Sequence, residues 1–245
     1  MLVAARSVWL AGEVALALLR FVMLIVAHAG VPDRTARAHW LQHVCRRALR
    51  VFHVHLRVTG SVPSRGLLVC NHLSYLDILV LGATTPCVFV SKCEVRHWPV
   101  FGWFASLAGT LFLHRDKRSD VPRMTREMRR VLDAGALVVL FPEGTTSDGR
   151  NVLPFKSALL EPATQPPHGL SAGFINYSLN DGNVADEVCY WRDMTLVPHL
   201  LNLLGKRGLD ARLCFTALRQ VSPDRKHLAR QLHSEVLRLK ESFCV

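Results

Sequence analysis

The chain of 245 residues is long enough to bury a full core and suits one large domain or a domain with an appendage. Half of its residues are hydrophobic and the net charge is +11, which favours anionic partners: nucleic acid, acidic lipid headgroups or phosphorylated substrates. The seven cysteines are an odd number without a Cys-x-x-Cys pair, which argues against a disulfide framework or a zinc site and indicates free thiols in a reducing compartment.

The first predicted helix covers residues 7–29 and is almost continuously apolar. It would be roughly 35 Å long, enough to cross a bilayer. Glu13 and Arg20 interrupt it, and each charge near the bilayer centre costs about 2.5–3.5 kcal/mol. A helix that spans the bilayer and one that lies in its interface therefore stay open. A signal peptide is a third interpretation, because Ala27–His28–Ala29 resembles a cleavage site, but Arg20 and the cysteines argue against it.

A second predicted helix covers residues 33–52, and Asp33 suits its N-cap. Apolar residues follow helical spacing on one face, and arginines crowd the rest of its surface: Arg34, Arg37, Arg46, Arg47 and Arg50. A basic amphipathic helix directly after an apolar one favours a membrane-surface anchor. The alternative is an ordinary domain helix with a solvated basic face. We therefore assign residues 1–53 to a pair of membrane-anchoring helices.

From about residue 54, short buried strands alternate with helical patterns. The expected strands are 67–71, 87–91, 111–114, 137–141, 170–177 and 211–217. The expected helices are 74–83, 95–107, 120–134, 156–163, 195–205 and 222–242. This alternation predicts that residues 54–245 form an α/β domain whose mainly parallel sheet is flanked by helices.

The first candidate site lies where the strand at 67–71 ends in His72 and an acid follows at Asp77. A local interpretation is that Ser74 and Asp77 form a capping box at a helix start, with His72 a loop residue. A functional interpretation is that the imidazole folds back onto the carboxylate, which fixes its tautomer and leaves the other ring nitrogen as a general base. No Ser or Cys nucleophile stands obviously paired with His72, so the hydroxyl to be activated would belong to the substrate.

Two further stretches place polar residues directly after strands. Arg115 follows the strand at 111–114, and its planar fork suits a phosphate at the carboxyl end of a sheet. Lys117 and Arg118 we interpret as a solvated loop. Because such strand ends converge on one crevice in an open α/β sheet, Arg115 and His72 are expected to share a site.

The other stretch is a buried strand that ends in Pro142–Glu143–Gly144 and continues with Thr145 and Thr146. Gly144 lets backbone approach a ligand, and the threonine hydroxyls can bond a headgroup. A carboxylate such as Glu143 at the end of a buried strand needs a partner. The alternative is a plain turn with a Thr/Ser helix cap. Lys156, a little further along, is another candidate for contact with an anion.

Together these stretches resemble the glycerolipid acyltransferases, the group that contains 1-acyl-glycerol-3-phosphate acyltransferase. The shared motifs are Asn-His-x-x-x-x-Asp at 71–77, Gly-x-x-Phe-Leu-x-Arg at 109–115 and Phe-Pro-Glu-Gly-Thr-x-Ser at 141–147. The resemblance covers about residues 55–218, and it implies a glycerol-3-phosphate acyltransferase-like fold with an N-terminal membrane-associated helix pair.

The resemblance also implies roles for individual residues. His72 would deprotonate an acceptor hydroxyl that attacks an acyl thioester, and Asp77 would orient His72. Arg115 would bind the acceptor phosphate. The residues to which the resemblance assigns acceptor or substrate contacts are Arg115, Glu143, Gly144, Thr145, Thr146 and, at a strand end where the family often has a lysine, Lys92.

The implied reaction moves a fatty acyl group from acyl-CoA or acyl carrier protein to 1-acyl-glycerol-3-phosphate and forms phosphatidate, with no cofactor or metal. Its expected setting is the anionic membrane surface at the cytoplasmic face of the inner membrane. Two departures open an alternative acceptor, lyso-ornithine lipid or another lysolipid. The segment 170–174 lacks the family's usual proline, and 178–198 is similar to a subgroup that includes bacterial lyso-ornithine lipid enzymes.

Three other classes are weaker interpretations. A catalytically silent membrane-binding protein would not need both His72 and Asp77. Nucleic-acid binding rests on charge alone, without a recognition motif. A metal site formed by His72, Asp77 and Glu143 lacks a second histidine placed to complete it.

Overall fold

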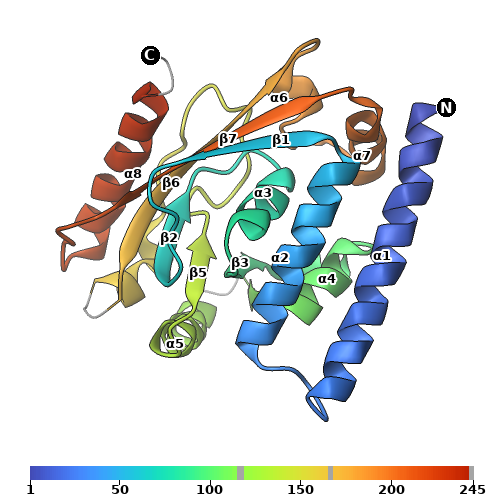
Figure 1. Ribbon diagram of the computed structural model, residues 1–245. Coiled ribbons are helices and arrows are strands. Elements are labelled where there is room, and N and C mark those ends of the chain that lie inside the picture. The colour runs from blue at the N-terminus through green and yellow to red at the C-terminus, as the bar shows by residue number, and fades with distance from the viewer. Residues whose placement is uncertain (115–118, 165–167, 243–245) are drawn as a thin grey trace.

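The computed structural model describes residues 1–114, 119–164 and 168–242. Within them, seven strands form one sheet in the order β1-β7-β6-β2-β5-β3-β4 (Figure 1). The strands are β1 (Val54–Thr59), β2 (Gly66–Cys70), β3 (Val88–Lys92), β4 (Leu111–Leu113), β5 (Leu137–Leu140), β6 (Leu170–Leu179) and β7 (Leu209–Ala217). Only β6 and β7 pair antiparallel among the described strands, and the other pairs are parallel. The predicted α/β class with a mainly parallel sheet is confirmed.

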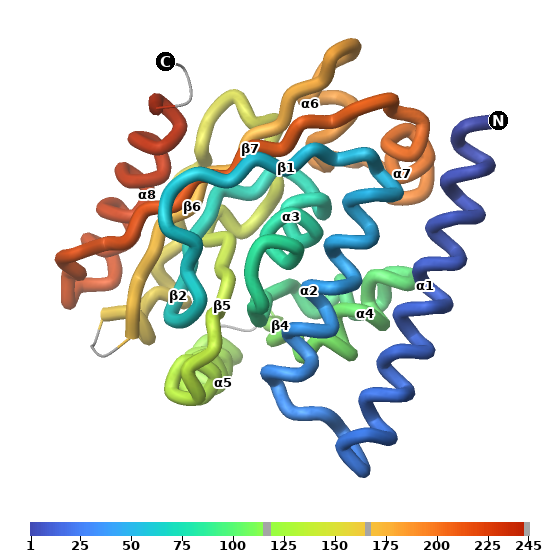
Figure 2. The backbone as a smooth tube through the Cα atoms, viewed as in Figure 1, coloured from blue at the N-terminus to red at the C-terminus, as the bar shows by residue number. Residues whose placement is uncertain are grey.

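Helices cover both faces of this sheet. They are α1 (Leu2–Ala27), α2 (Arg34–Val51), α3 (Leu76–Thr84), α4 (Phe101–Ala108), α5 (Asp120–Asp133), α6 (Val184–Glu187), α7 (Leu196–Gly205) and α8 (Arg225–Ser242). Short 3₁₀ turns are η1 (Cys93–His97), η2 (Ser157–Leu159) and η3 (Glu161–Ala163). The tube in Figure 2 shows α5 and α8 on the side of the molecule away from α1.

The two faces of the sheet belong to two hydrophobic clusters. Because successive strand residues point to opposite faces, Leu68 and Cys70 of β2 pack with α1–α4 and α7, whereas Leu67 and Val69 pack with α5 and α8. All five residues of β2 are buried. A central strand buried on both faces reads as a continuous apolar run, which is why this strand was predictable.

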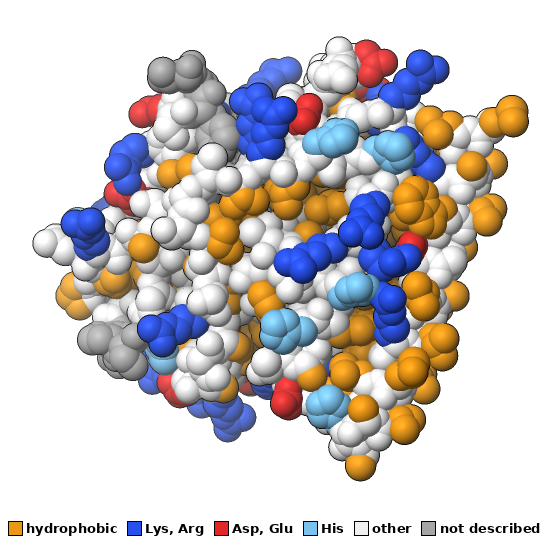
Figure 3. Space-filling view, viewed as in Figure 1, with side chains coloured by type: hydrophobic (Ala, Val, Ile, Leu, Met, Phe, Trp, Pro, Cys, Tyr) orange, Lys and Arg blue, Asp and Glu red, His pale blue; other side chains and the backbone are white. Residues whose placement is uncertain are grey.

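The N-terminal helices differ in how deeply they pack. In α1, Arg6, Ala17 and Phe21 are buried, and the most apolar 18-residue window of this helix has only 11% of its residues buried. This helix is long and apolar enough to cross a membrane by length and composition. By contrast, α2 packs against α3 and α4 and has Trp40 in its buried face. Figure 3 shows apolar side chains along α1 and basic ones over α2. The assignment of residues 1–53 as a separate anchoring unit stays a prediction.

Two local expectations were wrong, and one strand was missed. The expected helix at 95–107 is split into η1 and α4, because Pro99 lacks the N–H that a continuous helix needs. The expected helix at 156–163 is instead the pair of turns η2 and η3. Strand β1 was not anticipated, since it follows α2 closely and lies at the sheet edge with mostly exposed residues.

Candidate active site

The ends of several parallel strands carry the candidate residues to one edge of the sheet. The turn after β2 is fixed by Asn71, whose amide donates to the carbonyl of Ile175 (3.0 Å) and accepts from the Ile175 N–H (2.8 Å). Asn71 is almost fully buried. Its two hydrogen bonds tie the turn to β6, so the position of the next residue, His72, follows from the sheet.

His72 and Asp77 are in direct contact. The Nδ1 atom of His72 lies 2.7 Å from Oδ2 of Asp77. The same oxygen accepts from the backbone N–H groups of Leu73 (2.7 Å) and Ser74 (3.0 Å). Its other oxygen, Oδ1, accepts from the hydroxyl of Tyr177 at 2.6 Å. Asp77 therefore orients the imidazole and fixes the loop before α3. Only half of the expected capping box forms, because the Ser74 N–H donates to Asp77 whereas the buried Ser74 hydroxyl has no partner among the described residues, and α3 begins without a side-chain cap.

These contacts define the tautomer of His72. A carboxylate oxygen can only accept, so Nδ1 carries the hydrogen and Nε2 is left with its lone pair. The ring stacks on Phe141, with centroids 4.0 Å apart and planes 14° from parallel. Nε2 makes no hydrogen bond to any residue that the structure describes, and His72 lines a cavity of about 1260 Å³ that opens beside the strand ends. The geometry is that of a general base facing a substrate space.

The side chain of Glu143 lies outside the cavity lining, whereas the family resemblance implied that it contacts the acceptor. Its carboxylate is buried, accepts from the N–H of His72 (2.8 Å) and that of Leu153 (3.0 Å), and does not line the cavity. Burial raises the pKa of Glu143 to about 7, the two backbone N–H donors oppose the rise, and the negative charge of Asp77 adds to it. Glu143 thus acts on the site through the backbone of His72, and the partner that this buried carboxylate required is that backbone.

The turn that follows Glu143 brings backbone against a lysine. Gly144 has φ of +76°, and a Cβ there would lie 2.8 Å from Nζ of Lys156. The Ser147 N–H donates to the carbonyl of His72 (3.1 Å), which joins this turn to the loop after β2. The adjacent Thr145 and Thr146 line the cavity. Gly144 is therefore favoured by its backbone conformation, whereas the flexible end of Lys156 could shift to make room for a Cβ.

The cavity has a volume of about 1260 Å³ and runs from the strand ends to the N-terminal helices. Polar side chains at the strand ends line one part of it: His72, Lys92, His114, Thr145, Thr146 and Lys156. Apolar residues of α1, α2, α4 and α7 line the other, among them Leu10, Val14, Phe104 and Leu200. Arg115, which was also predicted to contact the substrate, lies outside the described residues, so its role stays a prediction. Such a space suits an amphiphile whose polar end lies at His72.

Comparison with known proteins identifies the family. The profile of the acyltransferase family matches residues 53–175, half of the chain. This chain belongs to the acyltransferase family. It is 37% identical over 221 residues to a lyso-ornithine lipid O-acyltransferase of Brucella abortus, with 80% of each chain covered. It is 32% identical over 192 residues to a 1-acyl-sn-glycerol-3-phosphate acyltransferase of Neisseria meningitidis serogroup B, with 77% of this chain and 74% of that one covered.

A solved structure supports the acyltransferase fold. The crystal structure of PlsC, the 1-acyl-sn-glycerophosphate acyltransferase of Thermotoga maritima, matches with a TM-score of 0.69 at 18% identity, covering 98% of this chain and 95% of that one. The family resemblance drawn from the motifs is thus confirmed, and so is the expectation of an O-acyltransferase. The roles of the individual site residues stay predictions.

The acyltransferase site contains residues that the sequence did not single out. Tyr177 reaches Asp77 across a separation of 100 positions, and no local pattern marks it. Asn71 stands inside the first motif, but its bonds to β6 follow from the pairing of β2 with β6. Phe141, the residue under the His72 ring, begins the third motif. Asn71 and Phe141 could have been found from the sequence because they stand in the motifs, whereas no sequence signal marks Tyr177.

Proposed function

We propose that this acyltransferase moves a fatty acyl group from an acyl thioester to the free hydroxyl of a lysolipid. The observation that carries the proposal is the His72–Asp77 pair, 2.7 Å apart, at the polar part of a cavity whose remainder is largely apolar. The polar part suits a headgroup and a reacting hydroxyl, and the apolar part suits fatty chains. The names of the relatives agree with a lysolipid acceptor.

The reaction follows from the tautomer of His72. Nε2 accepts the proton of the acceptor hydroxyl as its oxygen attacks the thioester carbonyl, and Asp77 stabilises the positive charge that forms on the ring. The tetrahedral intermediate then collapses, the C–S bond breaks, and the leaving thiolate takes the proton back from Nε2. The products are the acylated lipid and the free thiol. A thioester is already activated, so the proposed transfer uses neither a cofactor nor a metal ion.

Two acceptors are proposed. Lyso-ornithine lipid is the first to test, because the relative at 37% identity bears that name. The second is 1-acyl-glycerol-3-phosphate, the acceptor implied by the motif that contains Arg115 and named in the relative at 32% identity. The first lipid offers a carboxylate and the second a phosphate, and the side chains of Lys92 and Lys156 in the cavity lining suit either anion.

The proposed setting is the anionic surface of the cytoplasmic face of the inner membrane, with acyl-CoA or acyl carrier protein as donor. Support comes from the exposed apolar side chains of α1, which include Val8, Leu19, Val22, Met23 and Val26. The arginines of α2 lie beside them, and basic residues next to an apolar stripe favour binding to anionic lipid.

An acceptor panel tests the proposal. Purified protein in detergent is given a labelled acyl thioester and, separately, lyso-ornithine lipid, 1-acyl-glycerol-3-phosphate or glycerol-3-phosphate. We expect transfer to at least one of the two lysolipids, lost in His72→Ala and retained in His55→Ala, which removes an exposed histidine of β1. A His72→Ala protein with most of the wild-type rate would refute the proposed base. A folded wild-type protein that acylates neither lysolipid with either donor would refute the function.

A further inference from the structure

A second, smaller cleft of about 380 Å³ lies between α5, the turns η2 and η3, and the start of α8. Its charged lining residues are Arg126, Arg129, Arg225 and Glu161. Arg129 donates to Glu161 at 2.7 Å, so these two charges offset each other. Arg126 and Arg225 form no ion pair with any residue that the structure describes. The cleft therefore presents two guanidinium groups with uncompensated charge.

The cleft adjoins the active-site cavity. Val121 of α5 and Ala158 of η2 line both spaces. Ala158 stands two residues after Lys156, whose side chain packs against Gly144 in the turn after β5. A ligand with an anionic end in the cleft can therefore extend past Val121 and Ala158 into the cavity that His72 lines.

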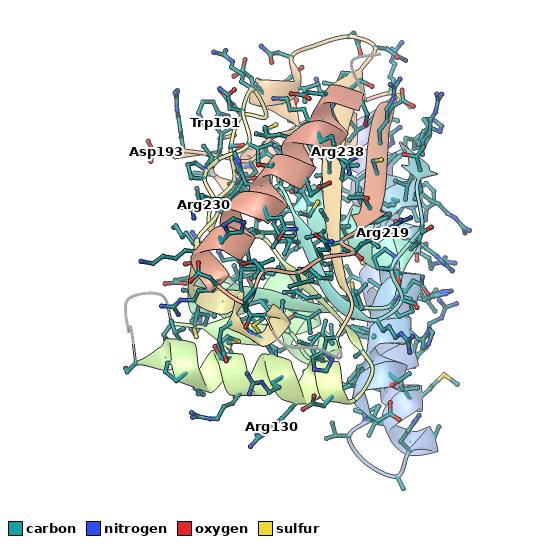
Figure 4. The ribbon with its side chains drawn as sticks, turned by 90° about the vertical axis from the view of Figure 1, so that its left-hand side faces the viewer. Arg130, Trp191, Asp193, Arg219, Arg230 and Arg238 are labelled. Atoms are coloured by element: carbon teal, nitrogen blue, oxygen red, sulfur yellow. The ribbon has the colours of Figure 1, made fainter. Side chains whose placement is uncertain are left out.

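The cleft also lies on the side of the molecule away from the helices that would contact the lipid acceptor. In Figure 1, α5 and α8 are on the side of the molecule opposite α1, and Figure 4 looks onto that side. The apolar part of the cavity, which suits fatty chains, is lined by α1 and α2 instead. A polar, water-soluble end of a substrate would thus approach from the α5–α8 side, while a lipid approaches from the α1 side.

We propose that this cleft binds the phosphate of the phosphopantetheine arm that carries the acyl thioester. The inference rests on the proposed acyl transfer. Coenzyme A and acyl carrier protein both hold the acyl group at the thiol end of a pantetheine arm, and in both the other end of the arm is a phosphate. Arginine forks bind phosphate with paired charge-assisted hydrogen bonds, and a concave space of this size suits a small anionic group. The arm passes Val121 and Ala158 and presents the thioester carbonyl at His72.

The test compares donors that differ only in the phosphate. S-acyl-phosphopantetheine and S-acyl-pantetheine are given to the full-length protein with the acceptor that the panel identifies, and kcat/KM is measured for each. In the wild type we expect the phosphorylated donor to be preferred by roughly tenfold or more. In the double variant Arg126→Ala/Arg225→Ala this ratio should fall to near one, with the rate on S-acyl-pantetheine unchanged.

A matched control is Arg230→Ala/Arg238→Ala, which removes two exposed arginines from α8 outside the cleft (Figure 4). It should keep the wild-type ratio, which separates a local site from the effect of net charge. A wild-type ratio near one, or an unchanged ratio in the cleft variant, would overturn the proposal while leaving acyl transfer intact. A wild-type protein that uses no donor at all would instead count against the proposed function.

Two further arms keep the test decisive. Should the cleft variant fail to fold, raising the salt concentration with wild-type protein must weaken use of the phosphorylated donor and leave S-acyl-pantetheine unaffected. Acyl-CoA and acyl carrier protein are assayed alongside to identify the source of the arm. A loss in the cleft variant with carrier protein alone, and not with S-acyl-phosphopantetheine, would replace the phosphate site with a protein-docking surface and refute the proposal.

Discussion

The carboxylate of Asp77 is fully buried and accepts hydrogen bonds from two backbone N–H groups, from the imidazole of His72 and from the hydroxyl of Tyr177. Burial raises the pKa of Tyr177, so the phenol stays protonated and donates. A buried charge is tolerated when its lone pairs are used in this way. Tyr177, which does not line the cavity, therefore contributes to the orientation of His72 through Asp77.

Tyr177→Phe tests this dependence. The change removes one charge-assisted hydrogen bond, an interaction of about 1.5–3 kcal/mol, and leaves the ring in place. We expect kcat to fall by roughly tenfold with little change in either KM, because Tyr177 does not line the cavity. Steady-state kinetics with both substrates varied, together with a melting temperature, would measure the effect.

Thr85→Val is the matched control for Tyr177→Phe. The Thr85 hydroxyl is also buried and donates to a backbone carbonyl, that of Pro63 (3.0 Å), away from the site. It should lower the melting temperature without changing kcat. If both variants lose stability and neither loses kcat, Tyr177 has a structural role only.

The raised pKa of Glu143 predicts that the stability of the protein depends on pH. This pKa is raised from 4.5 to about 7, so between these values the folded protein holds a proton that the unfolded chain has released. The stabilising contribution is fully present below about pH 4.5 and is lost as pH rises through about 7. Relative to Glu143→Gln, which does not titrate there, the wild type should lose about 3 kcal/mol of unfolding free energy across this window. Denaturant unfolding of both proteins at several pH values measures it, and a constant difference between them would contradict the shifted pKa.

At the scale of elements, basic residues of the N-terminal helices bind the carboxyl ends of other helices. Arg37 donates to the carbonyls of Leu107 and Ser106, both at 2.6 Å, at the end of α4. Arg46 donates to Ala83 (2.9 Å) at the end of α3, and Arg6 donates to Leu204 (3.0 Å) at the end of α7. The last carbonyls of a helix have no partner inside it and carry partial negative charge, so arginine stabilises them. These contacts hold together the helices that line the apolar part of the cavity.

Arg37→Ala should therefore destabilise the fold. Burial lowers the pKa of Arg37, yet two carbonyls accept from its guanidinium, and their loss should cost about 2 kcal/mol. Arg34→Ala, on the same helix, removes an exposed arginine and should have almost no effect. Thermal unfolding of the two variants distinguishes them, and equal melting temperatures would assign Arg37 to the solvated surface instead.

At this scale, the sequence predicts an element only where the residues of that element form a local pattern. The buried strands β2 and β5 and the residues at their ends were predictable, because a continuous apolar run followed by Asn71–His72 or Pro142–Glu143 is a local signal. Strand β1 depends on pairing with β7, about 150 positions away, and residues that are mostly exposed give little pattern. The contact between Tyr177 and Asp77 is hidden for the same reason, since it needs β6 beside β2.

At the scale of the whole molecule, one end suits contact with lipid and the other suits contact with water. The α1 end exposes apolar side chains, and the α5–α8 end carries the arginine-lined cleft. The active-site cavity lies between them, with lining residues from α1 to the β5 turn. In the proposed acyl transfer, the lipid acceptor would reach His72 from a membrane surface on the α1 side, and the thiol product would leave towards water.

The apolar face of α1 yields a test of that arrangement. Val22 and Val26 lie four residues apart on one face of the helix and are 55% and 74% exposed. Replacing both by aspartate should weaken binding to anionic vesicles by about a hundredfold or more, because charge is costly at the depth of the acyl chains. Vesicle co-sedimentation measures the loss. Activity on a short-chain, water-soluble acceptor should remain, since neither valine lines the cavity.

The control is Val58→Asp/Val62→Asp, which makes the same change at two exposed valines near the β1 edge of the sheet. If both double variants bind vesicles equally weakly, added negative charge alone explains the loss, and α1 has no special part in it. If only the α1 variant is released, and with it activity on long-chain acceptors, then the route of the lipid to His72 starts at α1. Retained binding in the α1 variant would leave the basic face of α2 as the membrane contact, because electrostatic attraction persists without apolar insertion and is weakened by salt.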